Sequence, residues 1–484
     1  TKLRNNYKIL FMEFSGIEID NIESVRLRVN NKVKRAVSRF LRRYKFSDVA
    51  MGKIERCELA EDILEEFLDI VSDEKIYLLI DEYDHFANAI LAEDMARFME
   101  IVGKGGFVRS FYEVVKTGAM LGVFDRIFIT GVTPITMDSL SSGFNIAENI
   151  SLEQDFNELC GFTEEELEYL LGQTIFKECE QIDRDVLRED VRRFYDGYVF
   201  NADADKRVYN ATLINYFLKR FDYARCQYPY HLLDSNIATD YKKLMMLFGI
   251  GDREENYEVL KEFIIEGEVS GSIKDRYEIE EGFGRDDFLT LLFSLGFITI
   301  KDSLGSRFKF MITNYVIRHL YFNYFARELD RRVQLRLQSC MIEDMLYELA
   351  TGGKIEPFVQ ELDRVIKHLA NRDFMKFDEK HFKAIVLTLL SYAEFYYVKS
   401  ENEVENRYPD IMLLRRKPYE EKIKYEYLLE LKWAQKGEVE EKLRSGKDQV
   451  RTYLEMEEIR ERKGLKAYVV VGSKHGVVME RVEE

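Results

Sequence analysis

The sequence predicts a multidomain α/β protein, and three observations lead to that fold class. The chain has 484 residues, more than one hydrophobic core usually organises, which favours about three domains. Near its start, short apolar runs of strand length alternate with amphipathic helical stretches, as in a parallel sheet flanked by helices. Near its end, a second strand-rich segment, 396–433, is followed by a helix and a further strand at 467–471.

The first region should contain three buried strands joined by helices. We expect strands at 8–14, 76–80 and 126–130, and helices at 25–44, 60–71 and 107–121. From Thr163 to about residue 220 the pattern is helical, and Thr163 followed by Glu166 is the pattern of a capping box. Apolar strands that give way to a purely helical stretch indicate that a separate unit begins near 161.

A small unit is expected between the helical region and the C-terminal strands. Within 255–330 we expect a helix at 286–295, a turn at Gly296 and two short strands, 297–301 and 307–312. A helix followed by a hairpin is the outline of a winged helix. An ordinary α+β connector is the alternative, and the pattern alone leaves both open.

Composition excludes several classes of protein. The formal net charge is −17, so the whole molecule is not an electrostatic binder of nucleic acid. Five prolines and the lack of a Gly/Ser-rich stretch predict domains that abut without long linkers. No apolar run reaches about 18 residues and no signal peptide is visible. Five scattered cysteines without a CxxC pair favour neither a disulfide framework nor a zinc site, so we expect reduced thiols and a cytoplasmic location.

One local segment departs from the acidic average. Nine lysines and arginines lie between Arg26 and Lys45 with no acid among them. A helix of this kind can neutralise backbone phosphates, and a solvated helix face is the alternative. The candidate nucleic-acid-binding residues are Lys34, Arg35, Arg39, Arg42 and Arg43.

The strand-rich C-terminal segment carries a pattern suited to phosphodiester hydrolysis. Asp410 opens an expected strand at 411–415, and a second strand at 424–432 ends in Glu430, Leu431 and Lys432. Side chains alternate along a strand, so Glu430 and Lys432 share one face, and pairing of the two strands would bring Asp410 close to Glu430. Carboxylates hold Mg²⁺, and a nearby ammonium group positions water or neutralises phosphate. The alternative is a charged surface hairpin.

Further residues fit the same site. Glu403 lies shortly before Asp410 and supplies a third acid, with Glu401 and Glu394 as competitors. Gln449 and Tyr453 are four residues apart on an expected helix and face the same way. We therefore expect Asp410, Glu430 and Glu403 as metal ligands, and these three with Lys432, Gln449 and Tyr453 as the catalytic set.

The strand at 76–80 ends in Asp81 and Glu82, as a Walker B strand of a P-loop ATPase does. Thr130, at the end of the next strand, would lie near a γ-phosphate, so Asp81, Glu82 and Thr130 are the candidate nucleotide-binding residues. The sequence contains no G-x-x-x-x-G-K-S/T loop. We expect ATP binding only if such a loop precedes Thr1. The alternative is that nucleotide binding has been lost.

Taken together, these motifs resemble a family of bacterial and archaeal proteins that join an AAA-ATPase-like region to a PD-(D/E)XK nuclease domain. Asp81-Glu82-Tyr83-Asp84 resembles the family's DEYD signature, and Gln449 with Tyr453 resembles the QxxxY motif of RecB-like nucleases. The stretches 402–405 and 407–410 keep the family's acids but lack its glycines. The resemblance covers nearly the entire chain.

The resemblance implies a P-loop NTPase-like sheet without its Walker A segment, a helical lid, a winged-helix-like middle and a restriction-endonuclease-like C-terminal domain. The corresponding boundaries are 1–160 (truncated at its N-terminus), 161–245, 246–335 and 336–484. The implied function is a Mg²⁺- or Mn²⁺-dependent nuclease acting on DNA, branched or single-stranded substrates included, and regulated by the ATPase-like module. DNA is the expected partner, and a homo-oligomer is one possible assembly. There are two alternatives. One is a nucleotide-dependent switch that binds DNA without cleaving it, and the other is a scaffold in which both sites are vestigial.

Overall fold

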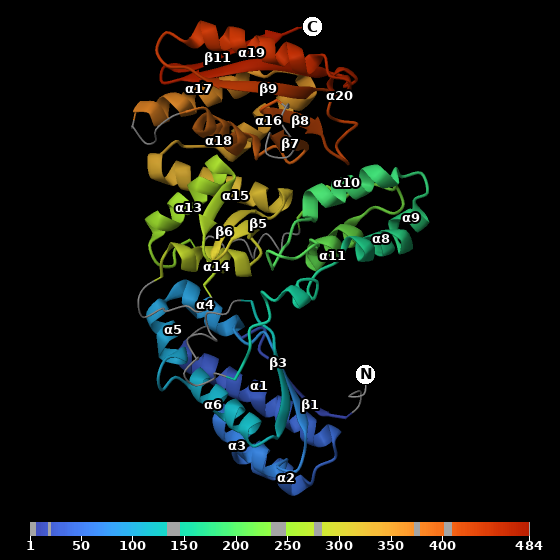
Figure 1. Ribbon diagram of the computed structural model, residues 1–484, viewed down its shortest axis with the longest axis vertical. Helices are drawn as coiled ribbons and strands as arrows, with labels where there is room; N and C mark the ends of the chain where they lie inside the picture. Colours follow the sequence, from blue (N-terminus) through green and yellow to red (C-terminus); the bar gives the residue numbers. More distant parts are fainter. Residues whose placement is uncertain are drawn as a thin grey trace.

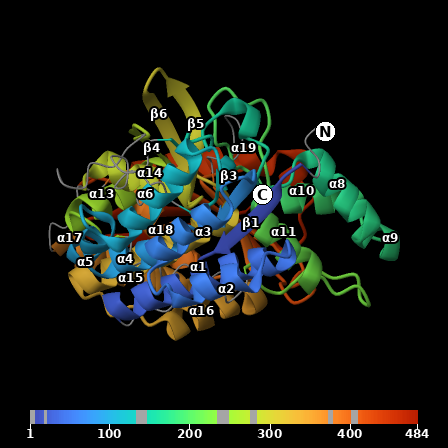
Figure 2. The same ribbon diagram turned by 90° about the horizontal axis from the view of Figure 1, so that it is seen from below.

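The computed structural model describes residues 6–17, 21–132, 146–233, 248–274, 283–371, 378–400 and 409–483. The N-terminal region lies at one end of the molecule and the C-terminal region at the other, with the middle unit between them (Figure 1). The helical region projects sideways from this column, as both the side view and the view from below show (Figure 2).

The N-terminal region is a three-stranded parallel sheet in the order β1-β2-β3. Its strands are β1 (Lys8–Glu13), β2 (Ile76–Asp81) and β3 (Phe124–Ile129). Its helices are α1 (Ile22–Arg43), α2 (Asp48–Arg56), α3 (Ala60–Ile70), α4 (His85–Glu93), α5 (Met95–Val102) and α6 (Phe107–Met120). The three expected strands are present. Helix α1 begins three residues earlier than expected because Asn21 and Ser24 form a capping box.

The helical region contains α8 (Glu164–Gln173), α9 (Ile175–Glu178), α10 (Arg184–Tyr195) and α11 (Ala211–Arg220), preceded by the short helix η1 (Gln154–Phe156). The capping box predicted at Thr163 and Glu166 is present at the start of α8. Phe194 of α10 packs against Tyr397, with ring centroids 6.1 Å apart. The helical region therefore shares a hydrophobic core with the C-terminal sheet.

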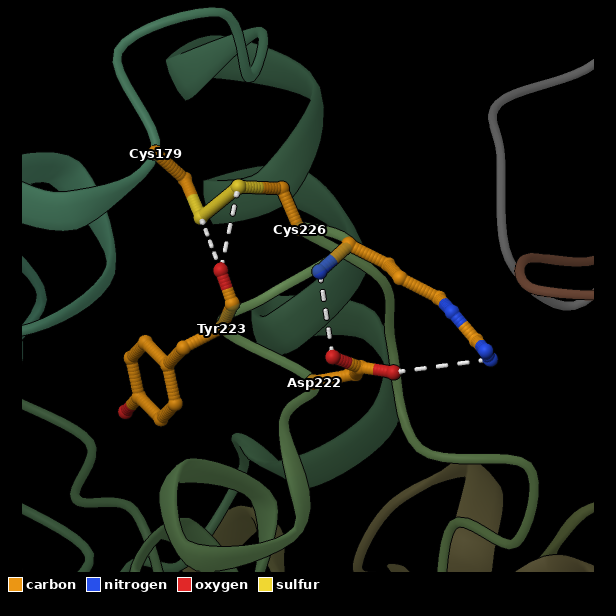
Figure 3. Close-up of a disulfide and its surroundings, with 5 residues drawn as sticks. Cys179, Asp222, Tyr223 and Cys226 are labelled. Atoms are coloured by element: carbon orange, nitrogen blue, oxygen red, sulfur yellow. Dashed lines mark hydrogen bonds and ion pairs between the residues drawn. A yellow bond between two sulfur atoms is a disulfide. The ribbon is translucent and has the colours of Figure 1, made fainter.

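A disulfide joins Cys179 to Cys226, which contradicts the expectation of reduced, unpaired cysteines. Cys179 ends α9, and Cys226 lies in the segment after α11, 47 residues further along the chain. Both sulfur atoms lie beside the backbone carbonyl of Tyr223, as Figure 3 shows. The pairing arises from the packing of distant helices, so cysteine spacing alone carries no sign of it. Cys57, Cys160 and Cys340 are free.

The middle unit combines helices with a three-stranded antiparallel sheet in the order β4-β6-β5. Its elements are α13 (Arg253–Glu266), β4 (Glu268–Gly271), α14 (Arg285–Ser294), β5 (Ile298–Leu304), β6 (Arg307–Ile312) and α15 (Tyr315–Val333). The expected helix and hairpin are present as α14, β5 and β6. Strand β4 was not expected, because four residues are too few to show an alternating pattern.

The C-terminal region is a mixed five-stranded sheet in the order β11-β10-β9-β8-β7, with β9 and β10 parallel. Its strands are β7 (Tyr396–Ser400), β8 (Ile411–Arg415), β9 (Glu426–Trp433), β10 (Leu465–Ser473) and β11 (Gly476–Val482). Its helices are α16 (Ser339–Gly352), α17 (Glu356–Asn371), α18 (Glu379–Leu390), α19 (Val439–Leu454) and α20 (Glu457–Arg460).

This sheet is buried on both faces, and the two faces belong to different cores. Leu429 and Leu431 of β9 lie in the core that also contains α18 residues such as Phe382. Leu428, on the opposite face, lies in the core formed with Val450 of α19. Because side chains alternate along a strand, Glu430 and Lys432 emerge on the α19 face.

Throughout the described residues, no helix is long and apolar enough to cross a membrane.

Candidate active site

Strands β8 and β9 bring Asp410 beside Glu430. Asp410 directly precedes β8, and its neighbour Ile411 pairs with Leu429 of β9. The backbone N–H of Leu431 donates to Asp410 Oδ2 at 2.8 Å. This bond holds the Asp410 carboxylate against β9, next to Glu430. The two acids, 20 positions apart in the numbering, therefore meet at one end of the hairpin.

The two carboxyl groups are buried and repel one another. Glu430 is 3% exposed and Asp410 is 5% exposed. Burial, and then repulsion by Asp410, raises the pKa of Glu430 to about 7, although Lys432 acts in the opposite direction. Among the described residues, Glu430 Oε2 is a buried oxygen with no hydrogen-bond partner. Two acids in this arrangement favour a cation between them, which would remove both the repulsion and the unsatisfied oxygen.

Lys432 lies on the same strand face as Glu430 and contacts this acid of the pair. Its Nζ donates to Glu430 Oε1 at 2.7 Å and lies 3.7 Å from Glu379 Oε1. Burial lowers the pKa of Lys432, but the hydrogen bond and attraction of Glu430, with smaller contributions from Glu379 and Asp410, more than offset it. The pKa of Lys432 therefore lies above its ordinary value, and the side chain is an ammonium ion at neutral pH.

The first two turns of α18 supply two residues that the sequence motifs did not identify. Glu379 contacts Lys432 and also accepts the backbone N–H of Trp433 at 3.4 Å. Lys383, one turn further on, has its Nζ 3.5 Å from Asp410 Oδ1. The spacing Glu379–Lys383 is an i, i+4 pair on one helix face. Such pairs are common on ordinary surface helices, so the spacing gives no sign that Glu379 reaches Lys432 and Lys383 reaches Asp410.

At the carboxyl end of the N-terminal sheet, Asp81 and Thr130 are in contact. Thr130 Oγ1 donates to Asp81 Oδ1 at 2.5 Å, and the backbone N–H of Glu82 donates to the same oxygen at 3.1 Å. Glu82 has φ of 51°, in the left-handed region, so the chain turns sharply directly after β2. The three candidate nucleotide-binding residues therefore lie together at the ends of two neighbouring parallel strands.

Two models of known protein families match the chain, one near each end. Residues 1–141 match the AAA-ATPase-like family, described as a predicted AAA-ATPase. Residues 377–481 match the PD-(D/E)XK nuclease superfamily, and this segment contains Asp410, Glu430 and Lys432. The chain joins an AAA-ATPase-like domain to a PD-(D/E)XK nuclease domain.

One curated relative adds a partial match. The chain is 31% identical over 149 residues to a protein of Azotobacter chroococcum mcd 1 described as an uncharacterized protein in the vnfD 5' region. The match covers 30% of this chain and 25% of the relative. The aligned part therefore spans a quarter of that relative's length.

The helix of the nuclease domain that carries Gln449 and Tyr453 covers the sheet face of Glu430. Helix α19 buries Leu443, Gly446 and Val450 against the sheet. A Cβ atom at Gly446 would lie 2.5 Å from Val469 Cγ1, so only glycine permits this close approach. Gln449 is exposed and Tyr453 is half-buried. Both candidates thus lie along the edge of the buried helix face.

A divalent cation fits the acid pair of the nuclease domain. Asp410 and Glu430 offer oxygen ligands of the kind that Mg²⁺ and Mn²⁺ prefer. Within the described residues no group of three or more His, Cys, Asp or Glu side chains is placed to hold a metal ion. The third expected ligand, Glu403, lies outside the described residues. The unsatisfied Glu430 oxygen and the raised pKa of this acid both favour a positively charged group at this point.

In the AAA-ATPase-like domain, Asp84, the last acid of the segment 81–84, has a structural role. Asp84 is fully buried, and its carboxylate accepts the backbone N–H of Val132 at 3.0 Å and the side-chain amide of Asn88. A Cβ atom at Gly131 would lie 2.1 Å from the Tyr83 ring. Asp84 and Gly131 therefore fasten the loop after β3 against the end of β2.

The basic segment of the AAA-ATPase-like domain forms helix α1, and its candidates differ in position. Arg35, Arg39 and Arg42 are exposed, and their spacing places them on one face of the helix, about 10 Å from first to last. Lys34 instead donates to the Glu55 carbonyl at 2.8 Å. Arg43 lies over the ring of its neighbour Tyr44, 5.9 Å from the centroid.

Proposed function

We propose that the nuclease domain hydrolyses phosphodiester bonds of DNA with the help of Mg²⁺ or Mn²⁺. The observation that carries this proposal is the buried pair Asp410 and Glu430, with one unsatisfied oxygen and with Lys432 beside it. A bound divalent ion supplies Lewis acidity and lowers the pKa of water that attacks a phosphate. Membership of the PD-(D/E)XK superfamily supports a nuclease, and the choice of DNA and of the metal belongs to our proposal.

Each residue of the site has a role that follows from its chemistry. Asp410 and Glu430 hold the cation, with Glu403 as an additional ligand. Lys432 orients the attacking water or neutralises the charge that develops on the phosphate, while Glu379 keeps its ammonium group in place. Gln449 and Tyr453 orient the substrate along α19.

The direct test is a cleavage assay with the purified chain. Single-stranded, duplex and branched DNA, and an RNA strand of the same sequence, are incubated with Mg²⁺, with Mn²⁺ or with EDTA. We expect cleavage of DNA with either metal and none with EDTA. Metal-independent cleavage, or no cleavage of any substrate with either ion, would refute the proposal. DNA binding without cutting would instead support the alternative of a nucleotide-dependent switch.

We propose that the AAA-ATPase-like domain regulates the nuclease. Asp81 is placed to hold the Mg²⁺ of a nucleotide, Glu82 to polarise water and Thr130 to contact a phosphate. These residues need a phosphate-binding loop, and the sequence carries no such motif. Addition of ATP to this chain of 484 residues should therefore leave the rate of DNA cleavage unchanged.

The raised pKa of Glu430 predicts that metal binding depends on pH. The protonated carboxyl is a poor ligand, so each Glu430 that is protonated must release its proton before it binds a cation. Because the pKa of Glu430 is about 7, affinity for Mn²⁺ should fall by about tenfold per pH unit below that value and level off above it. Calorimetry in buffers of different ionisation enthalpy measures both the affinity and the protons released. The same affinity at about pH 6 and about pH 8 would contradict this prediction.

We further propose that the exposed arginines of α1 contact the DNA backbone. Replacing Arg35, Arg39 and Arg42 with Gln should weaken DNA binding for all sequences and reduce the slope of log affinity against log salt by about one unit per arginine. Fluorescence anisotropy at several salt concentrations measures both effects. Arg126→Gln, an exposed arginine of the same domain, is the control. An unchanged slope in the triple variant would show that α1 is a solvated face only.

A further inference from the structure

The hairpin of β5 and β6 extends away from the rest of the middle unit, beyond α13 and α14 (Figure 2). Ile300 and Phe310, which face each other across the hairpin, are its last fully buried residues. Beyond them the strand pairing shifts register between Ile300 and Asp302, and a two-residue turn follows at 305–306. A Cβ atom at Gly305 would meet no atom within 4 Å beyond its chain neighbours. The turn is therefore clear of the surrounding protein.

The tip of this hairpin carries an exposed leucine beside an arginine. Leu304 pairs with Arg307 across the turn, so the two side chains lie on the same face of the hairpin. Leu304 is 88% exposed, the largest fraction among the exposed large hydrophobic side chains of the described residues. Phe308, on the opposite face, stacks with Phe310 and packs against the core. The face that carries Leu304 and Arg307 therefore points to solvent.

The hairpin is locally basic, although the net charge of the whole chain is −17. Residues 301–309 contain three basic side chains and one acid, a net charge of +2. Glu268 of β4 pairs with Lys301 and with Lys309, at 2.5 and 3.2 Å. Arg307, by contrast, forms no ion pair with any residue in the part of the chain that the structure describes. The positive charge at the tip therefore complements an anionic partner.

Helix α14, which precedes the hairpin, is not available to read DNA. In helix-turn-helix proteins a recognition helix lies in the major groove and contacts the edges of the bases. In α14, the seven consecutive residues 287–293 are buried. Leu291 belongs to the core of the N-terminal region, and Phe288 belongs to the core that also contains Leu429 of β9. Of the helix and hairpin that outline a winged helix, only the hairpin is exposed to a partner.

The dimensions of the hairpin fit the minor groove of duplex DNA. The four residues from Lys301 to Leu304 extend roughly 13 Å beyond Ile300. The minor groove is about 7.5 Å deep and about 6 Å wide. The side chains at the tip can therefore reach the floor of the groove while the body of the protein stays outside the phosphates. Proteins that bind this groove insert leucine and similar side chains between base steps and place arginine or lysine beside them.

We propose that the β5–β6 hairpin binds duplex DNA, with Leu304 inserted between base steps of the minor groove and Arg307 on a phosphate at the edge of the groove. The choice of DNA rests on the function proposed above. The hairpin belongs to the middle unit, so it holds the duplex at a point separate from the acid pair of the nuclease domain. It also favours duplex DNA over a single strand, because a single strand has no groove for the tip to enter.

The two tip residues should affect DNA binding in different ways. Leu304→Ala should lower the affinity for duplex DNA about 5- to 10-fold and reduce the bend of the duplex, because the apolar wedge is lost. Its salt dependence should not change. Arg307→Gln should lower the affinity by a similar factor and reduce the slope of log affinity against log salt by about one unit. Both variants should bind a single strand of the same sequence within about twofold of the unmodified chain.

Fluorescence anisotropy measures these affinities with the full chain in EDTA, so that the acid pair holds no metal ion and the DNA is not cut. Energy transfer between dyes at the two ends of the duplex measures the bend. Leu121→Ala and Arg126→Gln are the matched controls, because the two side chains are 66% and 62% exposed. Both controls should leave every value unchanged.

Two outcomes would overturn the proposal. One is a tip variant, Leu304→Ala or Arg307→Gln, that equals its control on duplex DNA. The other is an equal loss of affinity for duplex and single-stranded DNA, which would indicate general attraction without insertion into a groove. Both tip residues are exposed, and circular dichroism verifies that each variant is folded.

Failure of the proposed function is distinguishable from failure of this inference. A chain that binds duplex DNA through the hairpin but never cuts it with Mg²⁺ or Mn²⁺ refutes the hydrolase and supports the inference. A chain that cuts DNA, and whose tip variants equal their controls, refutes the inference alone. An unmodified chain without measurable affinity for duplex DNA also overturns the inference.

Discussion

Replacing Asp410 with Asn, or Lys432 with Met, is expected to lower the rate of DNA cleavage by at least about 10²- to 10³-fold. Asp410→Asn can still accept the N–H of Leu431, so the hairpin should persist while a negatively charged metal ligand is lost. Lys432→Met removes the ammonium group that contacts Glu430 and leaves that acid without its cation. Both variants remove a charged group at the reacting phosphate, where such groups lower the activation barrier of hydrolysis most.

Matched variants separate this effect from general damage. Asp448→Asn and Lys436→Met change the same residue types at exposed positions of the same domain and should cut DNA at the unmodified rate. Initial rates with Mn²⁺ give the comparison, and circular dichroism verifies that each variant is folded. Rates within a few-fold of the unmodified protein for both Asp410→Asn and Lys432→Met would exclude this site as the catalytic centre.

Reduction of the disulfide between Cys179 and Cys226 is expected to destabilise the helical region by about 4 kcal/mol on the loop-entropy model. The bond closes a loop of 47 residues, and opening it restores the conformational freedom of that loop in the unfolded chain. The loss should be largest in α10 and α11, which lie within the closed loop. Amide hydrogen exchange with and without reductant measures the free energy of opening for each of these helices.

Cysteine variants provide the control for this prediction. The double variant Cys179→Ser with Cys226→Ser should show the low stability of the reduced protein whether or not reductant is present. Cys57→Ser, which replaces a free cysteine, should behave as the unmodified chain does. If alkylation and mass spectrometry find both Cys179 and Cys226 as free thiols in the non-reduced protein, the disulfide does not form and the prediction fails.

Local pattern accounts for much of the fold. Strands β2 and β8 were predictable because each is a continuous apolar run flanked by polar residues, as buried strands are. The start of α8 was predictable because Thr163 and Glu166 satisfy the first backbone donors of the helix. Strand β4 was not predictable because its four residues are too few to show an alternating pattern. The disulfide was not predictable because it joins cysteines 47 residues apart.

Some residues of the candidate site were likewise predictable from the sequence, and others were not. Asp410, Glu430 and Lys432 were recognisable because strand alternation and the pairing of consecutive strands relate them over a short stretch of chain. Glu379 and Lys383 were not recognisable, because their place depends on how α18 packs on the sheet. Phe382 contacts Trp433 with ring centroids 5.7 Å apart and approaches Gly472 closely. This packing turns the next helix position toward Asp410.

From its residues alone, the chain determines its strands, its capped helices and the order of acids and lysine along one hairpin, because each depends on neighbours within a few residues. Only the tertiary structure decides that α18 brings Lys383 to Asp410, that the helical region shares a core with the C-terminal sheet, and that Cys179 meets Cys226. These are contacts between surfaces whose relative placement depends on side-chain packing across the whole molecule. No periodicity in the sequence encodes that packing.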